Sequence, residues 1–204
     1  MSYKNEFKNC LDGLFESLCD VSDWMYENPE LGFQEFKTSK YLVDYIQKNS
    51  KSVNYPSHGL ETAFDITFGE EGPLTVICVE YDALPEIGHA CGHNIIATAS
   101  IGAGLALKDI ASKLAIRVKL LGTPAEEGGG GKIILINEGA FEDASCSMMI
   151  HPGYEDVVNP TFTTIQQYTV EYFGKDAHAA GAPDQGINAL DAQIQLFVNA
   201  STYR

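Results

Sequence analysis

The apolar run at residues 74–79 (LTVICV) is continuous rather than alternating, which predicts a strand that is buried on both faces. Residues 115–121 predict another strand, and the apolar run at residues 146–150 predicts a further buried strand. Helical patterns lie between the runs at residues 92–107 and 131–137. Strands that alternate with helices in this way are typical of α/β proteins. We therefore expect an α/β fold with a largely parallel sheet flanked by helices.

Two helices and one strand are expected before this alternation begins. Apolar residues recur at helical spacing over residues 7–25, and a second helix is expected from about residue 34 to residue 47. Residues 62–68 alternate roughly as a strand does. The first half of the chain should therefore supply helices to pack on the sheet as well as one of its strands.

The character of the sequence changes at Pro160. Residues 164–173 are rich in β-branched and aromatic side chains, which favours a strand, and residues 188–198 have apolar side chains at helical spacing. We place a domain boundary here, so that residues 1–160 form one domain and residues 161–204 begin another.

Composition restricts the partners of the chain. Lysine and arginine number 13 against 28 aspartates and glutamates, which gives a formal net charge of −15. Binding to nucleic acid or to anionic lipid needs a basic surface, so neither partner is expected. The N-terminus has no apolar signal segment, and no uninterrupted apolar run approaches the roughly 20 residues of a membrane span. The odd number of cysteines, five, favours free thiols in a reducing compartment, and we expect a cytoplasmic protein.

Groups that can bind metals or move protons follow three of the expected strands. They are Glu80 and Asp82 after the first strand, Glu126 and Glu127 after the second, and His151 after the third, with Cys91 and His93 shortly behind the first group. In an open α/β sheet the carboxyl ends of the parallel strands meet at one edge, where ligands bind. Thiolate, imidazole and carboxylate groups together suit a divalent metal such as zinc.

Each of these features alone has a simpler interpretation. A single Cys-x-His is weak evidence for a metal, adjacent glutamates often do no more than complement a helix dipole, and a histidine before a proline can be a turn residue. His178 is likewise interpreted as a turn histidine from its neighbours alone. Taken together at the ends of predicted strands, the features favour a metal site.

Two other motifs are rejected. Residues 128–132 (GGGGK) resemble a phosphate-binding loop, but the position after the lysine is Ile133 rather than Ser or Thr, and the preceding glutamates would repel phosphate. Cys91 and His93 are too close in sequence for a typical nucleophile and base, which usually come from separate segments.

At these residues the sequence resembles the M20 metallopeptidase family, in its amidohydrolase branch. The segments that carry the resemblance appear in the family's order and are NPELGFQE (28–35), EYDALPEIGHACGHN (80–94), GTPAEEGGGGK (122–132), MIHPG (149–153) and GKDAHAAGAP (174–183). The nearest subgroup contains the p-aminobenzoyl-glutamate hydrolases and the dipeptidases called M20 domain-containing protein 2. The resemblance implies a zinc-exopeptidase-like catalytic domain, followed by the beginning of an α+β lid and dimerisation domain.

The resemblance also implies an activity and a set of site residues. The activity is metal-dependent hydrolysis of an amide or peptide bond in a small substrate, an N-acyl or aminobenzoyl amino acid or a dipeptide. It uses two divalent ions, zinc or manganese, in an enzyme that forms a homodimer through its lid. By position, the implied metal ligands are Cys91, His93, Glu127 and His151, and the implied catalytic residues are Glu126 as general base, Asp82 as the group that orients a ligand, and His178 as the group that polarises the substrate carbonyl.

The sequence departs from many members of the branch at two positions. Asn94 follows Cys-Gly-His where auxin-conjugate and hippurate hydrolases often have Asp, and Asn28 stands where they often have His. Both departures favour the aminobenzoyl-glutamate and dipeptidase subgroup. In addition, the rest of the family's lid and a last metal-ligating histidine lie beyond the position of Arg204, so we expect these 204 residues alone to be inactive.

Two other kinds of function remain open at this point. One is a catalytically incomplete fragment or pseudoenzyme that binds metal or dimerises without turnover. The other is a small-molecule binding module that uses the same pocket without a metal. Metal analysis of the purified protein tests the binding module, because that function needs no metal.

Overall fold

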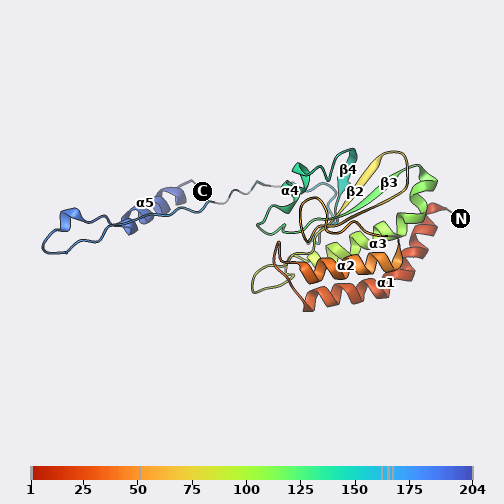
Figure 1. The fold of residues 1–204 in the computed structure, drawn as a ribbon, viewed down its shortest axis with the longest axis horizontal. Coiled ribbons are helices and arrows are strands. Elements are labelled where there is room, and N and C mark those ends of the chain that lie inside the picture. Colours follow the sequence, from red (N-terminus) through yellow and green to blue (C-terminus); the bar gives the residue numbers. More distant parts are fainter. Residues whose placement is uncertain (1, 51, 162, 165, 167, 204) are drawn as a thin grey trace. The chain divides into compact units, whose positions relative to one another are not determined.

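The computed structural model describes residues 2–203 except residues 51, 162, 165 and 167. The chain divides into two compact units, Met1–Asp156 and Val157–Arg204. The first unit contains the sheet and most of the helices, and the second contains one α-helix (Figure 1).

The first unit is a four-stranded sheet flanked by helices. Its elements are α1 (Tyr3–Glu27), α2 (Phe36–Asn49), β1 (Asp65–Phe68), β2 (Leu74–Val79), α3 (His93–Ala111), a short 3₁₀ helix (Ser112–Leu114), β3 (Arg117–Gly122), α4 (Gly131–Asn137) and β4 (Ala144–Met148). The strands lie in the order β1-β3-β2-β4. β2 runs parallel to both β3 and β4, and β1 is antiparallel to β3. The predicted α/β fold with a largely parallel sheet is confirmed.

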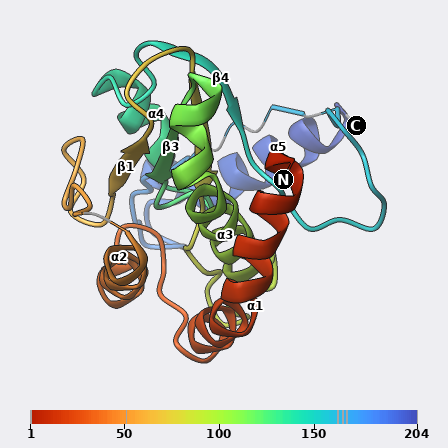
Figure 2. The ribbon, with the colours of Figure 1, turned by 90° about the vertical axis from the view of Figure 1, so that its right-hand side faces the viewer.

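Helices cover both faces of the sheet, as the continuous apolar run of β2 requires. On one face α3 packs on the strands and α1 packs on α3, around a core that includes Ile77 and Val79 (Figure 2). On the other face Leu135 of α4 packs against Val76 and Cys78. Neighbouring residues of β2 thus belong to different cores, so five of its six residues are buried. The bounds of β2 and α4 agree with those predicted from the sequence.

Small residues let α3 approach the sheet closely. A Cβ atom added to Gly104 would lie 2.5 Å from the side chain of Leu120 on β3, and one added to Gly102 would lie 2.7 Å from Leu18 on α1. The segment His93–Leu114 has the length and the mean hydropathy, 1.3, of a membrane-crossing helix, although it has no long uninterrupted apolar run. Of the 18-residue stretch that gives this hydropathy, 61% is buried inside the protein, which is the environment of a core helix.

One predicted strand is less buried than its composition suggested. The apolar run at residues 146–150 corresponds to β4, which ends at Met148 and leaves that side chain 54% exposed. The prediction of a buried strand is wrong because β4 is an edge strand and pairs only with β2 within the described residues. The strand predicted at residues 115–121 begins later, at Arg117, because Ala115 adopts a left-handed conformation after the 3₁₀ helix.

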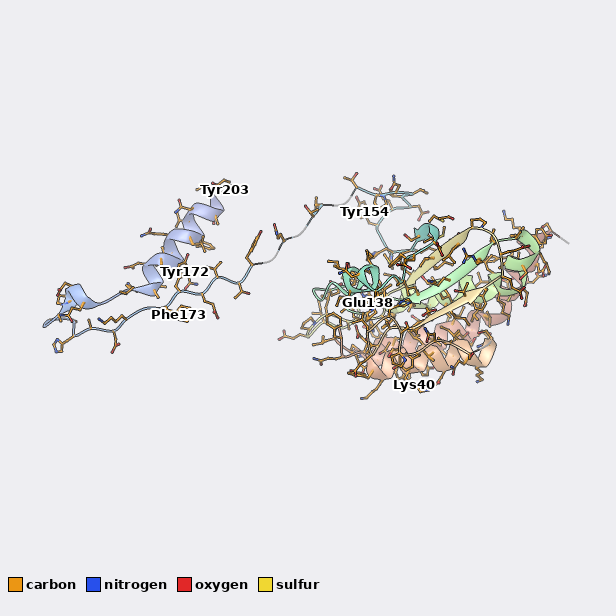
Figure 3. The ribbon with its side chains drawn as sticks, turned by 45° about the horizontal axis from the view of Figure 1, so that its top comes forward. Lys40, Glu138, Tyr154, Tyr172, Phe173 and Tyr203 are labelled. Carbon is orange, nitrogen blue, oxygen red and sulfur yellow. The ribbon has the colours of Figure 1, made fainter. Side chains whose placement is uncertain are left out.

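The second unit has the predicted helix, and its described residues do not form the predicted strand. The helix is α5 (Ala189–Ser201). Asn188 caps its beginning, because the side chain of Asn188 accepts a hydrogen bond from the backbone N–H of Leu190. The described residues of segment 164–173 form no strand; residues 165 and 167 lie outside the described part. A strand needs a partner, and the backbone pairing described in this unit is confined to a bridge between Lys175 and Ile187. Aromatic side chains such as Phe173 and Tyr203 are largely exposed (Figure 3).

Two helical glycines should respond in opposite directions to replacement by alanine. Gly104→Ala should lower the free energy of unfolding by about 1–3 kcal/mol, because the new methyl group overlaps Leu120. Gly13→Ala in α1 should raise it by about 0.5–1 kcal/mol, because alanine favours the helix. Gly13 is a matched control, since a Cβ atom there meets nothing within 4 Å.

Urea denaturation followed by circular dichroism measures both effects. Equal shifts of the two variants in the same direction would contradict the close packing of α3 on β3.

Candidate metal centre

The site lies where β2, β3 and α3 meet. Glu80 and Asp82 follow the last residue of β2, and His93 is the first residue of α3. Gly92 caps that helix with φ +81°, and a Cβ atom there would lie 2.9 Å from Pro152. The tight turn therefore lets the segment after β4 pass close to the beginning of α3. These contacts bring the ends of separate strands together, as expected of an open α/β sheet.

Asp82 holds the two sides of the site together. Its Oδ1 lies 3.0 Å from Nδ1 of His93, and its Oδ2 accepts a 2.9 Å hydrogen bond from the backbone N–H of Glu127. Burial alone would raise the pKa of Asp82, but the hydrogen bonds from His93 and from the Glu127 backbone outweigh burial and lower it. The buried carboxylate therefore connects α3 to the loop that follows β3.

The same contact orients the imidazole of His93. Its Nδ1 is 2.8 Å from the backbone carbonyl oxygen of Asp82 as well as 3.0 Å from its carboxylate, so both neighbours are acceptors. A proton on Nδ1 satisfies them and leaves Nε2 with a free lone pair when the ring is neutral. Carboxylate–histidine pairs of this kind orient metal-binding histidines in proteins.

The Nε2 atom of His93 faces three carboxylates. It lies 3.5 Å from Glu80 Oε2, 3.8 Å from Glu126 Oε2 and 3.7 Å from Glu127 Oε1. The side chain is only 1% exposed. Nε2 of His93 and Oε2 of Glu80 are both buried without a hydrogen-bond partner. Burial alone would lower the pKa of His93, but Asp82 and the other carboxylates raise it.

A divalent cation fits this arrangement. A lone pair that faces carboxylate oxygens is unfavourable unless a proton or a cation lies between them. In each of two groups of residues, the ligand atoms lie within 4.8 Å of one another. One group is Glu80, His93 and His151, and the other is His93, Glu126 and Glu127. Imidazole nitrogens and carboxylate oxygens are donors that zinc and manganese accept. The residues present therefore suit the metal that the resemblance implies.

Cys91 lies beside Glu127. Its thiol is partly buried, and a hydrogen bond to Glu127, together with burial, raises the pKa of Cys91 to about 11. Cys91 is outside both groups of closely spaced ligand atoms among the described residues. Its place as a metal ligand therefore stays a prediction, although its neighbour Glu127 faces His93 directly.

The two adjacent glutamates have different surroundings. Glu127 is anchored by its backbone bond to Asp82, and its side chain is 21% exposed. The side chain of Glu126 is 43% exposed. Burial, followed by the charge of Glu80, raises the pKa of Glu126, and Lys132 opposes this effect only in part. Glu126 is therefore the freer of the two glutamates, and it has a raised affinity for protons.

The two remaining predicted histidines lie in different units. His151 is exposed, its Nδ1 lies 2.8 Å from the carbonyl oxygen of Pro152, and its ring centre is 6.3 Å from that of His93. His178 belongs to the second unit, where its Nδ1 accepts hydrogen bonds from the backbone N–H groups of Ala180 and Gly181. That contact stabilises a turn, and the catalytic role of His178 stays a prediction.

The sequence analysis places Glu80 at this edge of the sheet but does not include it among the assigned ligands or catalytic residues. Glu80 is 1% exposed, forms an ion pair with Lys132 through Oε1, and contributes Oε2 to the group around His93. The sequence contains one signal for it, because Glu80 and Asp82 stand two residues apart at the end of β2 and so point the same way. It contains no comparable signal for Lys132, whose motif resembles only the rejected phosphate loop.

Sequence reasoning assigns Glu35 no role. Its carboxylate is fully buried and accepts hydrogen bonds from Ala125 N–H (2.8 Å) and from the hydroxyl of Thr62 (3.1 Å). Burial raises the pKa of Glu35, and these hydrogen bonds oppose that effect. Ala125 has φ +56°, a conformation that alanine rarely adopts, directly before Glu126. Glu35 therefore stabilises the loop that presents the glutamate pair.

Curated relatives of this chain are hydrolases. The chain is 38% identical over 208 residues to the Xaa-Arg dipeptidase of Mus musculus, covering 95% of this chain and 48% of that protein. It is 31% identical over 204 residues to one of the subunits of the p-aminobenzoyl-glutamate hydrolase of Escherichia coli, covering 90% of this chain and 42% of that protein. The chain thus spans about half the length of the curated relatives it matches.

Solved structures have the same fold. The Bacillus subtilis YXEP protein, described as a dinuclear metal-binding peptidase from the M20 family, superposes with a TM-score of 0.59 at 25% identity, over 67% of this chain and 42% of that one. A putative aminohydrolase from Staphylococcus aureus superposes with a TM-score of 0.69 at 20% identity, over 96% of this chain and 56% of that one.

The family assignment rests on a match to a family model. Residues 76–202, more than half of the chain, match the model of peptidase family M20/M25/M40. This segment contains all seven residues predicted to bind metal or to take part in catalysis. The resemblance inferred from the motifs is confirmed, and the chain belongs to peptidase family M20/M25/M40.

Proposed function

We propose that the protein hydrolyses an amide or peptide bond in a small substrate with the help of two divalent ions, zinc or manganese. The observation that carries the proposal is Nε2 of His93, which is buried, lacks a hydrogen-bond partner and faces three carboxylates. The dinuclear metal-binding description of the Bacillus subtilis structure supports the number of ions.

Cys91, His93, Glu127 and His151 would hold the metal ions. When bound, divalent ions lower the pKa of water and polarise the substrate carbonyl. Asp82 keeps His93 in the tautomer whose Nε2 can act as a ligand. Glu127 is the better ligand of the glutamate pair, because its backbone is anchored and its side chain lies beside the Cys91 thiol.

Glu126 would act as general base and then as general acid. Its exposed side chain can reach solvent, and its raised pKa favours acceptance of a proton. The same carboxyl group can then give its proton to the departing amine. In the second unit, the turn bonds of His178 use Nδ1 as acceptor and leave Nε2–H as a donor, which suits contact with a carbonyl oxygen.

The substrate class follows from the relatives. Their names specify dipeptides that end in arginine and p-aminobenzoyl-glutamate, so we propose a dipeptide or an aminobenzoyl amino acid as substrate. Asn94 donates a 3.0 Å hydrogen bond to Ser22 on α1. Asn94 therefore helps to anchor α3, and its effect on substrate choice would be indirect.

We also propose that the full-length protein is a cytoplasmic homodimer that pairs through the second unit. Support comes from α5, whose apolar side chains Leu190, Ile194 and Phe197 are more than half exposed. Sedimentation velocity of the full-length protein tests this proposal, and a monomer at micromolar concentration would contradict it.

The function is tested by metal analysis and substrate assays on the full-length protein. Elemental analysis should find close to two zinc or manganese ions per chain after dialysis. A panel of dipeptides and p-aminobenzoyl-glutamate should contain a substrate whose hydrolysis stops when the metal is chelated and resumes when it is returned. A protein that retains no metal would contradict the proposal.

Glu126→Gln should abolish turnover without loss of metal. Loss of a general base costs about 10²- to 10⁴-fold in kcat, while the ligands remain in place. Glu127→Gln is the matched comparison and should lower metal content as well as activity. Steady-state kinetics and elemental analysis of both variants measure this difference, and the reverse pattern would exchange the two roles.

Cobalt should report on Cys91. A thiolate bound to Co²⁺ gives a sulfur-to-metal absorption band in the near ultraviolet, so the cobalt-loaded protein should show this band and Cys91→Ser should lose it. Cys19→Ser is the control, because Cys19 is an exposed thiol on α1. A band of unchanged intensity in Cys91→Ser would remove Cys91 from the ligand set.

A further inference from the structure

We infer that Glu80 is a further ligand of the proposed metal centre and that Lys132 orients it. This inference rests on the proposed metal-dependent function. It adds a carboxylate to the set implied by the family resemblance, together with a lysine that the mechanism above does not use.

The two oxygens of Glu80 have different surroundings. Oε1 forms an ion pair with Nζ of Lys132, whereas Oε2 is buried without a hydrogen-bond partner. Oε2 lies 3.5 Å from Nε2 of His93, which is itself buried and without a partner. Two unpartnered polar atoms therefore face one another inside the protein.

A shared cation explains this pairing better than a direct hydrogen bond does. Nδ1 of His93 is engaged by two acceptors of Asp82, so the neutral ring has no proton on Nε2 to offer Glu80. Metal-to-ligand distances of about 2.0–2.2 Å place two ligands of one ion about 3–4 Å apart. The 3.5 Å separation between Glu80 and His93 falls in that range.

Lys132 fits the role of an orienting group. It is the second residue of α4, where the helix dipole disfavours a positive charge, so it does not stabilise that helix. Its side chain is 31% exposed, whereas that of Glu80 is 1% exposed. By binding Oε1, Lys132 partly offsets the cost of burying the carboxylate and leaves Oε2 turned towards His93.

The alternative is that Glu80 is only the ion-pair partner of Lys132. The two explanations differ in what Lys132→Met does to metal binding. If Glu80 binds the metal, Lys132→Met removes the orienting partner but keeps the ligand, and the loss of a nearby positive charge offsets part of that cost. The affinity for Zn²⁺ should then fall less in Lys132→Met than in Glu80→Gln. If only the ion pair matters, Lys132→Met and Glu80→Gln should have equal effects.

The test is Zn²⁺ affinity, measured on the full-length protein by competition with a chromophoric chelator. Glu80→Gln should weaken the affinity for Zn²⁺ by at least about 10-fold. Removing a residue that only supports a metal ligand already weakens metal affinity by about 10-fold or more. The double variant Glu80→Gln/Lys132→Met should show the same loss. The double variant also serves as the test if Glu80→Gln alone misfolds, because it does not leave Lys132 without its ion-pair partner. The visible absorption of the Co²⁺-loaded protein should also change with Glu80→Gln.

The matched controls are Glu6→Gln and Lys113→Met, which break an exposed ion pair between α1 and the 3₁₀ helix. They should leave Zn²⁺ affinity unchanged. Wild-type affinity in the folded double variant, or equal losses in Lys132→Met and Glu80→Gln, would overturn the inference and leave the proposed function intact. A wild-type protein that binds no Zn²⁺ and no Mn²⁺ would instead overturn both.

Discussion

The candidate site depends on the two hydrogen bonds that the carboxylate of Asp82 accepts. One oxygen orients His93 at the beginning of α3, and the other holds the backbone of Glu127 in the loop after β3. Asp82 itself follows β2, so a single buried side chain connects three elements that are distant in sequence. The free Nε2 of His93 and the position of Glu127 beside it both depend on this connection.

The fold could be predicted where the pattern of apolar residues alone distinguishes a helix from a strand. The continuous apolar run at β2 and the spacing of α4 gave the observed bounds, because both segments pack within the first unit. β4 has a similar composition but lies at the sheet edge, and apolar composition alone does not distinguish a covered strand from an uncovered one. Residues 164–173 have strand propensity, but propensity forms a strand only where a partner strand exists.

The site was predictable to the extent that its residues follow strands. Their positions after the expected strands predicted that Asp82, His93 and Glu126 lie at one edge of the sheet, and the structure places them there. Glu80 was placed at this edge without a specific role and Glu35 was missed, because their roles depend on partners far away in sequence: Lys132 for Glu80 and the Ala125 backbone for Glu35. A pattern of residue types contains no information about such pairs until the chain is folded.

The exposed edge of β4 has a consequence for assembly and for handling of the protein. Its sequence, ASCSM, contains no charged residue and no proline, the residues with which edge strands usually discourage pairing between molecules. Within the described part of the chain, β4 pairs on one side only, so its outer row of backbone groups can accept a strand from another segment or another molecule. Cys146 lies on this strand with an exposed thiol, so two edges that meet could also become covalently linked under oxidising conditions.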